Sequence, residues 1–166
     1  MSKIININMG EAIVAHNDTK LRTGGVGSCV IVILYDPEKK VGGMSHSVLP
    51  SRREGNKSVF FHLAEEIRNP GGMAKYADES VDYLIKEIQR NGGRKERLIA
   101  KLVGGAMTFK ILGDGKTNIG RQNVESAKQR IISLGIPIEG EDTGGTVGRI
   151  VEFNLENGLV DVMTKI

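Results

Sequence analysis

The sequence predicts an α+β domain with many short strands and two helices. Most strand-like segments are short and apolar, and prolines or paired glycines separate them. Two longer segments, residues 73–90 and 120–134, repeat their apolar residues at helical spacing. The last two apolar runs flank Asn157-Gly158, a step that favours the tight turn of a β-hairpin. A length of 166 residues suits one domain, which we expect to span residues 1–166.

Four strands are expected in the first fifty residues. They cover residues 4–9, 11–16, 30–35 and 40–49. The third, Val-Ile-Val-Ile-Leu-Tyr, is a continuous apolar run, which predicts a strand buried on both faces. Pro37 ends it, because proline cannot donate to a strand ladder. Residues 16–20 are polar and turn-like, and a glycine-rich turn, Thr23-Gly-Gly-Val-Gly-Ser-Cys29, precedes the third strand.

Residues 51–72 differ from the segments around them. They are polar, lie between Pro50 and Pro70-Gly-Gly, and carry one apolar cluster that includes Phe60 and Phe61. We expect an insertion that leaves the main fold, with room for one short helix. Such an insertion is peripheral to folding, because surface loops tolerate changes of length well.

The second half of the chain alternates helices and strands. The helix over 73–90 buries one apolar face and stops at Asn91-Gly-Gly. A strand over 98–103 ends at Gly104-Gly105, and the helix over 120–134 stops at Gly135. A short strand over 136–139, a turn over 143–146 and a terminal hairpin over 150–155 and 159–163 complete the pattern. The residues predicted to face inward on the two helices are Ala77, Val81, Leu84, Ile85, Ile88, Val124, Ala127, Ile131 and Leu134.

Composition excludes several classes of function. The net charge is only +3, from 23 basic and 20 acidic residues that are intermixed, which argues against a nucleic-acid partner. One cysteine cannot form an internal disulfide. The sequence carries neither a signal-peptide pattern nor an apolar run of transmembrane length, so we expect a cytoplasmic protein that does not insert into membranes and keeps its thiol reduced.

Three apparent ligand motifs fail on spacing. Gly115-Lys116-Thr117 resembles the end of a phosphate-binding loop, but the glycine needed five positions earlier is replaced by Lys110. Gly24–Gly27 precedes a strand, whereas a dinucleotide fingerprint precedes a helix. One cysteine and three scattered histidines show no paired zinc-ligand spacing, so no metal or cofactor is expected.

Cys29, the single cysteine, allows two interpretations. A lone cysteine in a cytoplasmic protein is usually a small buried hydrophobic residue. Two features favour a nucleophile instead. Its position after a glycine-rich turn would let backbone amides face a developing negative charge, and its place at a strand edge would hold the sulfur rigidly. A nucleophilic thiol of this kind would have to be accessible and largely ionised near neutral pH.

A nucleophilic thiol needs a base, and His46 is the best candidate among His16, His46 and His62. It lies in the strand that follows the strand of Cys29 after a short connection. If the two strands pair, the start of the first approaches the end of the second, which brings Cys29 near His46. Taken alone, His46 would be interpreted as a structural histidine.

Six blocks in order make the sequence resemble the CheD family of chemoreceptor glutamine deamidases. They are Thr23-Gly-Gly-Val-Gly-Ser-Cys29-Val, Val41-Gly-Gly-Met-Ser-His46-Ser-Val-Leu-Pro50, Lys75-Tyr-Ala-Asp78, Ala100-Lys-Leu-Val-Gly-Gly-Ala-Met, Asn118-Ile-Gly-Arg-Gln-Asn-Val and Glu141-Asp-Thr-Gly-Gly145. The resemblance implies mixed β-sheets that form a layered core with helices packed outside, similar to cysteine-dependent deamidating toxins. The insertion at 51–72 is longer than the connection expected in that family, so access to the site or choice of partner could differ.

The same resemblance implies the chemistry. Cys29 matches the family's nucleophile, His46 its base, and Thr23 the threonine that orients the histidine. The expected reaction is that of a protein-glutamine glutaminase: hydrolysis of receptor glutamine side chains to glutamate with release of ammonia, in chemotaxis adaptation and without a cofactor. The expected partners are a methyl-accepting chemoreceptor as protein substrate and, as in many members, a CheC-type phosphatase.

Other interpretations of these residues stay open. A non-catalytic adaptor could bind a receptor or a CheC-type phosphatase, although such an adaptor needs no Cys29–His46–Thr23 set. A different cysteine amidohydrolase, such as a peptidase, could use the same residues. A loop-capping hydroxyl is as good an interpretation of Thr23 as an orienting one. Asp142 and Thr143 are interpreted as turn residues.

Overall fold

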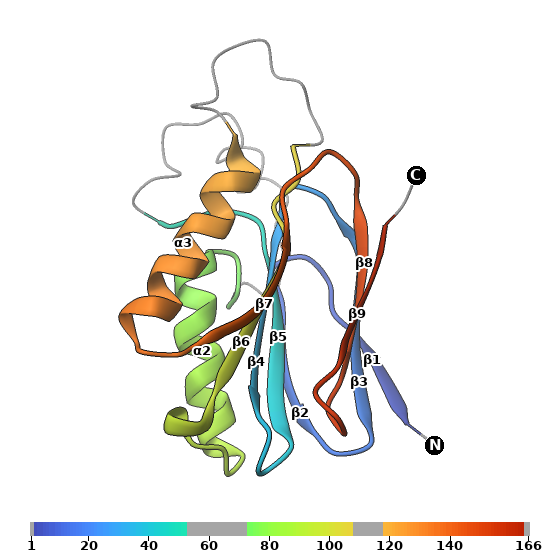
Figure 1. Cartoon of the computed structure of the whole chain (residues 1–166), viewed down its shortest axis with the longest axis vertical. Helices are drawn as coiled ribbons and strands as arrows, with labels where there is room; N and C mark the ends of the chain where they lie inside the picture. The colour runs from blue at the N-terminus through green and yellow to red at the C-terminus, as the bar shows by residue number, and fades with distance from the viewer. Residues whose placement is uncertain (1, 53–72, 108–117, 165–166) are drawn as a thin grey trace.

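The computed structural model describes residues 2–52, 73–107 and 118–164, which form three layers (Figure 1). Two α-helices, α2 (Ala77–Arg90) and α3 (Ile119–Ser133), cover one face of a five-stranded sheet. A four-stranded sheet covers its other face. The predicted α+β class, with layered mixed sheets and helices outside, is therefore confirmed.

The five-stranded sheet has the order β2-β5-β4-β6-β7 and the four-stranded sheet the order β1-β3-β8-β9. Both are mixed, because β6 pairs with β7 and β1 pairs with β3 in parallel, and the other pairs are antiparallel. The first sheet contains β2 (Ala12–His16), β5 (Val41–Ser47), β4 (Val30–Asp36), β6 (Ile99–Gly104) and β7 (Ile138–Thr143). The second contains β1 (Lys3–Asn6), β3 (Thr19–Val26), β8 (Arg149–Asn154) and β9 (Val160–Thr164). A 3-10 helix, η1 (Lys95–Arg97), precedes β6.

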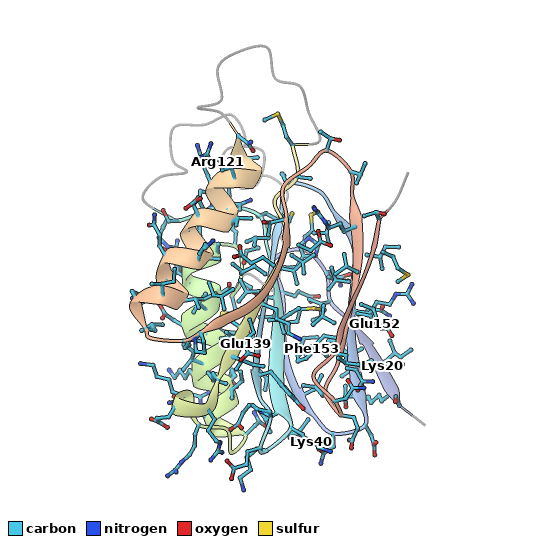
Figure 2. All side chains as sticks on the ribbon, in the orientation of Figure 1. Lys20, Lys40, Arg121, Glu139, Glu152 and Phe153 are labelled. Atoms are coloured by element: carbon cyan, nitrogen blue, oxygen red, sulfur yellow. The ribbon has the colours of Figure 1, made fainter. Side chains whose placement is uncertain are left out.

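Strand β4 is buried along its whole length, as its continuous apolar run predicts. Its side chains alternate between two cores. Val30, Val32 and Leu34 pack in the core beneath the helices, and Ile31, Ile33 and Tyr35 pack in the core between the sheets. Phe153 points into this second core, whereas Lys20 and Glu152 lie together on the outer face of the four-stranded sheet (Figure 2). The centre of the fold is therefore one strand shared by both cores.

The inward faces of the helices are largely as predicted, but α2 begins four residues later. All the predicted inward residues are buried except Leu134, which is partly buried. Residues 73 and 74 form a turn and Lys75 a bend, beside the residues that follow β5. The backbone amides of Val48 and Leu49 both donate to the Lys75 carbonyl, and Leu49 forms an isolated β-bridge with Tyr76. This bridge holds Tyr76 extended, directly before the first helical residue, Ala77.

Strand β3 is absent from the sequence prediction, which placed a glycine-rich turn there. Residues 19–26 pair with β1 on one side and β8 on the other, and only residues 27–29 bend. The Gly24-Gly25 pair lies in an irregularity of the ladder, between the pairs Thr23–Val151 and Val26–Arg149. Strand β7 is also longer than the predicted 136–139 and runs to Thr143, before the turn at Gly144 and Gly145. Residues 53–72, most of the predicted insertion, lie outside the described residues.

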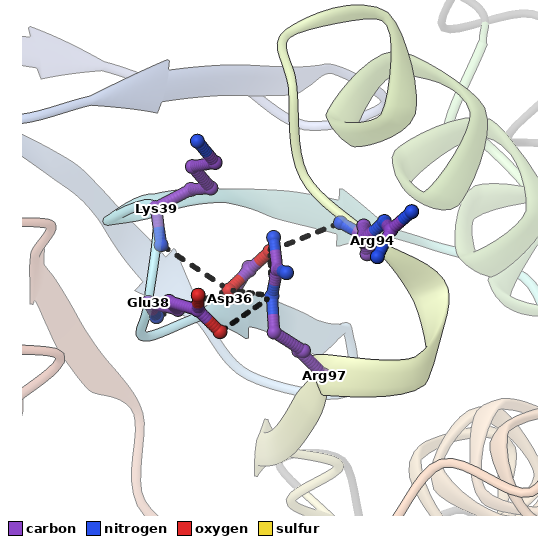
Figure 3. A network of polar contacts seen from close by, with 5 residues as sticks. All are labelled: Asp36, Glu38, Lys39, Arg94 and Arg97. Atoms are coloured by element: carbon purple, nitrogen blue, oxygen red, sulfur yellow. Dashed lines mark hydrogen bonds and ion pairs between the residues drawn. The ribbon is translucent and has the colours of Figure 1, made fainter.

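The end of β4 is held by a network of polar contacts around Asp36 (Figure 3). The carboxylate is fully buried, pairs with the Arg97 guanidinium at 2.9 Å, and accepts hydrogen bonds from the backbone amides of Glu38, Lys39 and Arg94. Burial by itself raises the pKa of Asp36, but the Arg97 and backbone hydrogen bonds outweigh it and hold that pKa below 3.8. The network ties the β4–β5 turn to the connection between α2 and β6.

We expect Asp36→Asn to lower the free energy of unfolding by about 2 kcal/mol at pH 7, less than for a fully buried pair because water reaches the Arg97 side. A lowered folded-state pKa stabilises the fold above the unfolded value and loses that effect as pH falls through the folded value. The gap between wild type and variant should therefore shrink below pH 3.8. Urea unfolding of both proteins across this pH range measures the difference in their free energies of unfolding.

Glu38→Gln is the matched control, since the same Arg97 guanidinium lies 3.4 Å from the exposed Glu38 carboxylate. This change should alter stability by no more than about 0.5 kcal/mol. Equal losses in the two variants would contradict the role given to the buried carboxylate.

Candidate active site

The antiparallel pairing of β4 with β5 brings Cys29 and His46 to one end of the five-stranded sheet. Ile31 lies opposite His46 and Val30 lies opposite Ser47, so Cys29 comes one position beyond the last pair of the ladder. Side chains alternate along a strand, which directs Ile31 and His46 toward the four-stranded sheet, and Cys29 lies in the bend just before β4. The predicted pairing of the two strands is confirmed, and it brings Cys29 and His46 to the same end of the sheet, although no hydrogen bond joins the sulfur to His46 Nε2.

Thr23 reaches His46 from the opposite sheet. Its hydroxyl oxygen lies 2.7 Å from His46 Nδ1, and the hydroxyl donates to the Ile7 carbonyl at 2.8 Å. Because the single hydroxyl proton is used on Ile7, the oxygen must accept from His46 Nδ1–H. Thr23 is a strand residue whose hydroxyl contacts both the imidazole and the carbonyl of Ile7 in the β1–β2 connection, so both interpretations of Thr23 keep support. The hydrogen bond selects the tautomer that leaves a lone pair on Nε2.

His46 is held as a neutral base. Its side chain is only 1% exposed, and burial lowers its pKa from 6.5 to about 4. Among the described residues, Nε2 has no hydrogen-bond partner. At neutral pH the imidazole therefore offers an unused proton acceptor inside the core.

Cys29 is a neutral thiol in this structure. It is 7% exposed, and burial raises its pKa from 9.0 to about 12, although its own backbone amide partly offsets the effect. The expectation of an accessible thiol that is largely ionised near pH 7 is wrong for this state, because removal from water disfavours the thiolate more than the nearby amide favours it. The resting pair consists of a neutral thiol and a neutral imidazole.

The backbone around Cys29 is clamped by the end of β6. The Cys29 carbonyl accepts from the Gly105 amide at 2.8 Å, and the Gly27 carbonyl accepts from the Ala106 amide at 2.9 Å. Gly104 has φ +111°, and a Cβ there would lie 2.3 Å from the Cys29 carbonyl oxygen. Only glycine fits so close an approach. Local patterns predict only that a strand ends at Gly104-Gly105, and the glycine pair itself is the signal in the sequence for this close approach to the site.

An open pocket of about 570 Å³ leads to the imidazole from outside. It is lined by residues 6–9, 22–25 and His46. Thr23 and His46 thus line a space large enough for a side chain, beyond the end of β1 and beside β3.

The other candidate residues lie elsewhere. His16 is exposed at the last position of β2, where it pairs with Val41, at the other end of β5 from His46. His62 falls outside the described residues. Asp142 and Thr143 end β7 rather than forming a turn. Asp142 accepts from the buried Arg149 at 3.2 Å, and Thr143 pairs with Gly104. In the described ranges, no group of acidic, histidine or cysteine side chains could hold a metal ion, and no helix is long and apolar enough to cross a membrane.

Comparisons with known proteins identify the family to which this chain belongs. The family model described as CheD, chemotactic sensory transduction, matches residues 63–164. A relative from Halalkalibacterium halodurans, named chemoreceptor glutamine deamidase CheD, is 37% identical over 99% of this chain and 95% of its own. One from Caldanaerobacter subterraneus, named probable chemoreceptor glutamine deamidase CheD, is 41% identical over 98% of this chain and 94% of its own. The chain belongs to the CheD family.

The solved structure of a hypothetical protein, YfiH from Bacillus licheniformis, is also similar to this chain. The two share 16% sequence identity with a TM-score of 0.45, over 80% of this chain and 50% of the other.

The buried neutral imidazole makes stability depend on pH. Between about pH 4 and 6.5 the unfolded chain binds a proton at His46 that the folded protein does not, so stability falls as pH drops through this window. We expect His46 to account for a loss of about 2 kcal/mol between pH 7 and pH 5. His46→Asn, which keeps a donor near Thr23, should lose correspondingly less stability over that range in urea titrations.

His16→Asn is the control for this measurement, because the His16 side chain is already exposed in the folded protein. It should retain the wild-type dependence on pH. If His46→Asn retained it as well, the imidazole would not be buried in its neutral form.

Proposed function

We propose that this chain is a protein-glutamine deamidase that converts glutamine side chains of methyl-accepting chemoreceptors to glutamate. Relatives that are 37–41% identical over nearly the whole chain carry the name of that activity. The observation that carries the proposal is the 2.7 Å contact between Thr23 and His46, which leaves Nε2 unprotonated at the end of the sheet where Cys29 precedes β4. The roles are Cys29 as nucleophile, His46 as base and Thr23 as the group that orients the base.

The reaction starts from the neutral pair. His46 Nε2 takes the thiol proton as the Cys29 sulfur attacks the carboxamide carbon, so the thiolate never has to persist in the dry core. A C–S bond forms and the carbonyl oxygen becomes an oxyanion. The Cys29 backbone amide, which hydrogen-bonds its own thiol, is a donor that could stabilise this charge, whereas the Gly27 amide is already used on the Gly25 carbonyl. The imidazolium then protonates the leaving nitrogen, ammonia departs, and a thioester remains.

Hydrolysis of the thioester restores the enzyme. A water molecule entering where ammonia left gives its proton to His46 Nε2 and attacks the acyl carbon. The C–S bond breaks, the sulfur regains a proton from the imidazolium, and glutamate is released. Thr23 contributes throughout by accepting from Nδ1–H, which stabilises the imidazolium and fixes the ring. The sequence of steps uses only this chain, the amide and water.

Incubation with a chemoreceptor cytoplasmic fragment tests the proposal by mass spectrometry and an ammonia assay. Each deamidated glutamine gains about one dalton, without chain cleavage. Cys29→Ala, Cys29→Ser and His46→Asn should lose activity at least about a thousandfold while remaining folded, since residues of a catalytic unit fail together. Thr23→Ala should lose less, and Thr23→Ser should retain more activity than Thr23→Ala.

Receptor deamidation by Cys29→Ala would show that Cys29 is not the nucleophile. If wild type bound the receptor fragment, or a CheC-type phosphatase, without releasing ammonia, the non-catalytic adaptor would stand in its place. Cleavage of the fragment would instead indicate a peptidase.

The pH profile gives an independent check on the base. His46 must be neutral to accept the thiol proton, and its pKa of about 4 keeps it neutral well below pH 6.5. We expect kcat/KM at pH 5.5 to stay within about twofold of its value at pH 7. A base with the ordinary histidine pKa would leave roughly a tenth of the activity at pH 5.5. Such a drop would contradict the buried neutral imidazole.

A further inference from the structure

Asn123 on helix α3 joins the ends of the two strands that carry the candidate catalytic residues. Its side chain is fully buried. The Nδ2 group donates to the Ser28 carbonyl at 2.9 Å and to the Val48 carbonyl at 3.1 Å. Ser28 directly precedes Cys29, and Val48 is two residues after His46. One side-chain amide thus contacts both strand ends, just beyond Cys29 and His46.

The two strands separate at this place. Their ladder ends at the pair Val30–Ser47, and beyond it each strand bonds a different partner. The Cys29 carbonyl accepts from Gly105, whereas the Val48 amide donates to Lys75. The Asn123 amide spans the opening between the diverging strands, where a ladder hydrogen bond would otherwise set their separation.

Helix α3 holds this amide in a fixed position. Asn118 caps the helix by accepting from the Arg121 amide at 3.0 Å. A Cβ at Gly120 would lie 2.6 Å from the Ala106 carbonyl oxygen and 2.7 Å from atoms of Gly105. The first turn of α3 therefore packs against the segment that clamps Cys29, and Asn123 follows one turn later.

Packing alone does not explain why a polar amide is buried at this position. Burying a primary amide is unfavourable unless its donors are satisfied, and an apolar side chain would fill the space without that cost. Both N–H groups of Asn123 are used on Ser28 and Val48, and both acceptors belong to the strand ends of the site. The chemistry of the side chain thus matches the task of linking two carbonyl groups.

We propose that Asn123 is a positioning residue, whose amide fixes the separation of the strand ends that carry Cys29 and His46. This inference rests on the proposed function for its effect on rate, but its effect on geometry stands apart from it. A misplacement of about 1 Å between reacting groups can cost about a hundredfold in rate. Asn123 itself lies behind the strands and acts through their backbone.

The test uses two readouts on the full chain. The first is kcat and KM for deamidation of a receptor fragment. The second is the rate at which iodoacetamide modifies Cys29 at pH 8, which is unambiguous because the chain has one cysteine. For Asn123→Ala we expect kcat to fall at least thirtyfold with KM within threefold, and alkylation to accelerate at least tenfold as the strand ends part. Asn123→Asp, which replaces the donor with a carboxylate facing two carbonyls, should behave in the same way.

Ser126→Ala is the matched control. Ser126 also lies on α3, but its hydroxyl donates to the Pro50 carbonyl at 2.6 Å and not to the carbonyl of Ser28 or Val48. It should keep kcat and the alkylation rate within threefold of wild type. All assays are run at a temperature where urea unfolding shows each protein to be more than about 99% folded.

Each outcome decides between the two roles. If Asn123→Ala and Asn123→Asp match Ser126→Ala in both readouts, the positioning role is wrong and Asn123 only supports packing. If Asn123→Ala does not fold, the decision rests on Asn123→Asp. If wild type fails to deamidate the receptor fragment, the proposed function falls, and the alkylation rates alone decide whether Asn123 holds the geometry around Cys29.

Discussion

The register of β4 against β5 is the constraint on which the rest of this structure depends. Ile31 lies opposite His46, and this pairing directs the imidazole toward Thr23 in the other sheet. A slip of one residue would turn every side chain of β4 to the opposite face. The alternation of β4 between two cores makes such a slip costly, because it would repack both cores at once. Burial of apolar side chains therefore secures the geometry of a polar site.

The site occupies an environment in which ions are unfavourable. Burial moves the pKa of Cys29 up and that of His46 down, so the resting groups are both neutral. A neutral pair avoids the cost of two buried charges while no substrate is present. The same dry surroundings strengthen any hydrogen bond that forms to developing charge during a reaction. Protection of the thiol and a capacity for catalysis thus come from one physical cause.

The two ends of the sheet are built differently. At the far end, the buried Asp36 carboxylate meets a guanidinium and three backbone amides, and the contact serves to fasten a turn. At the site end, His46 Nε2 and Asn123 Oδ1 are buried without a partner among the residues that the structure describes. Stable cores seldom leave such atoms unsatisfied. The acceptor on His46 Nε2, which has no partner among the described residues, is the one that the proposed base needs, whereas Asn123 acts through the strand backbone.

The sequence by itself determined the local elements and the identity of the central residues. The apolar run of β4, the apolar faces of the two helices and the Asn157-Gly158 hairpin are decided by short-range patterns, and Cys29 stands out because it is the single cysteine. Only the tertiary structure decided that residues 19–26 form a strand, since their glycines disfavour one and two neighbouring strands impose it. It also decided the protonation of Cys29 and His46 and the place of Asn123, because burial and contacts between residues 75 and 95 positions apart have no signature in local sequence.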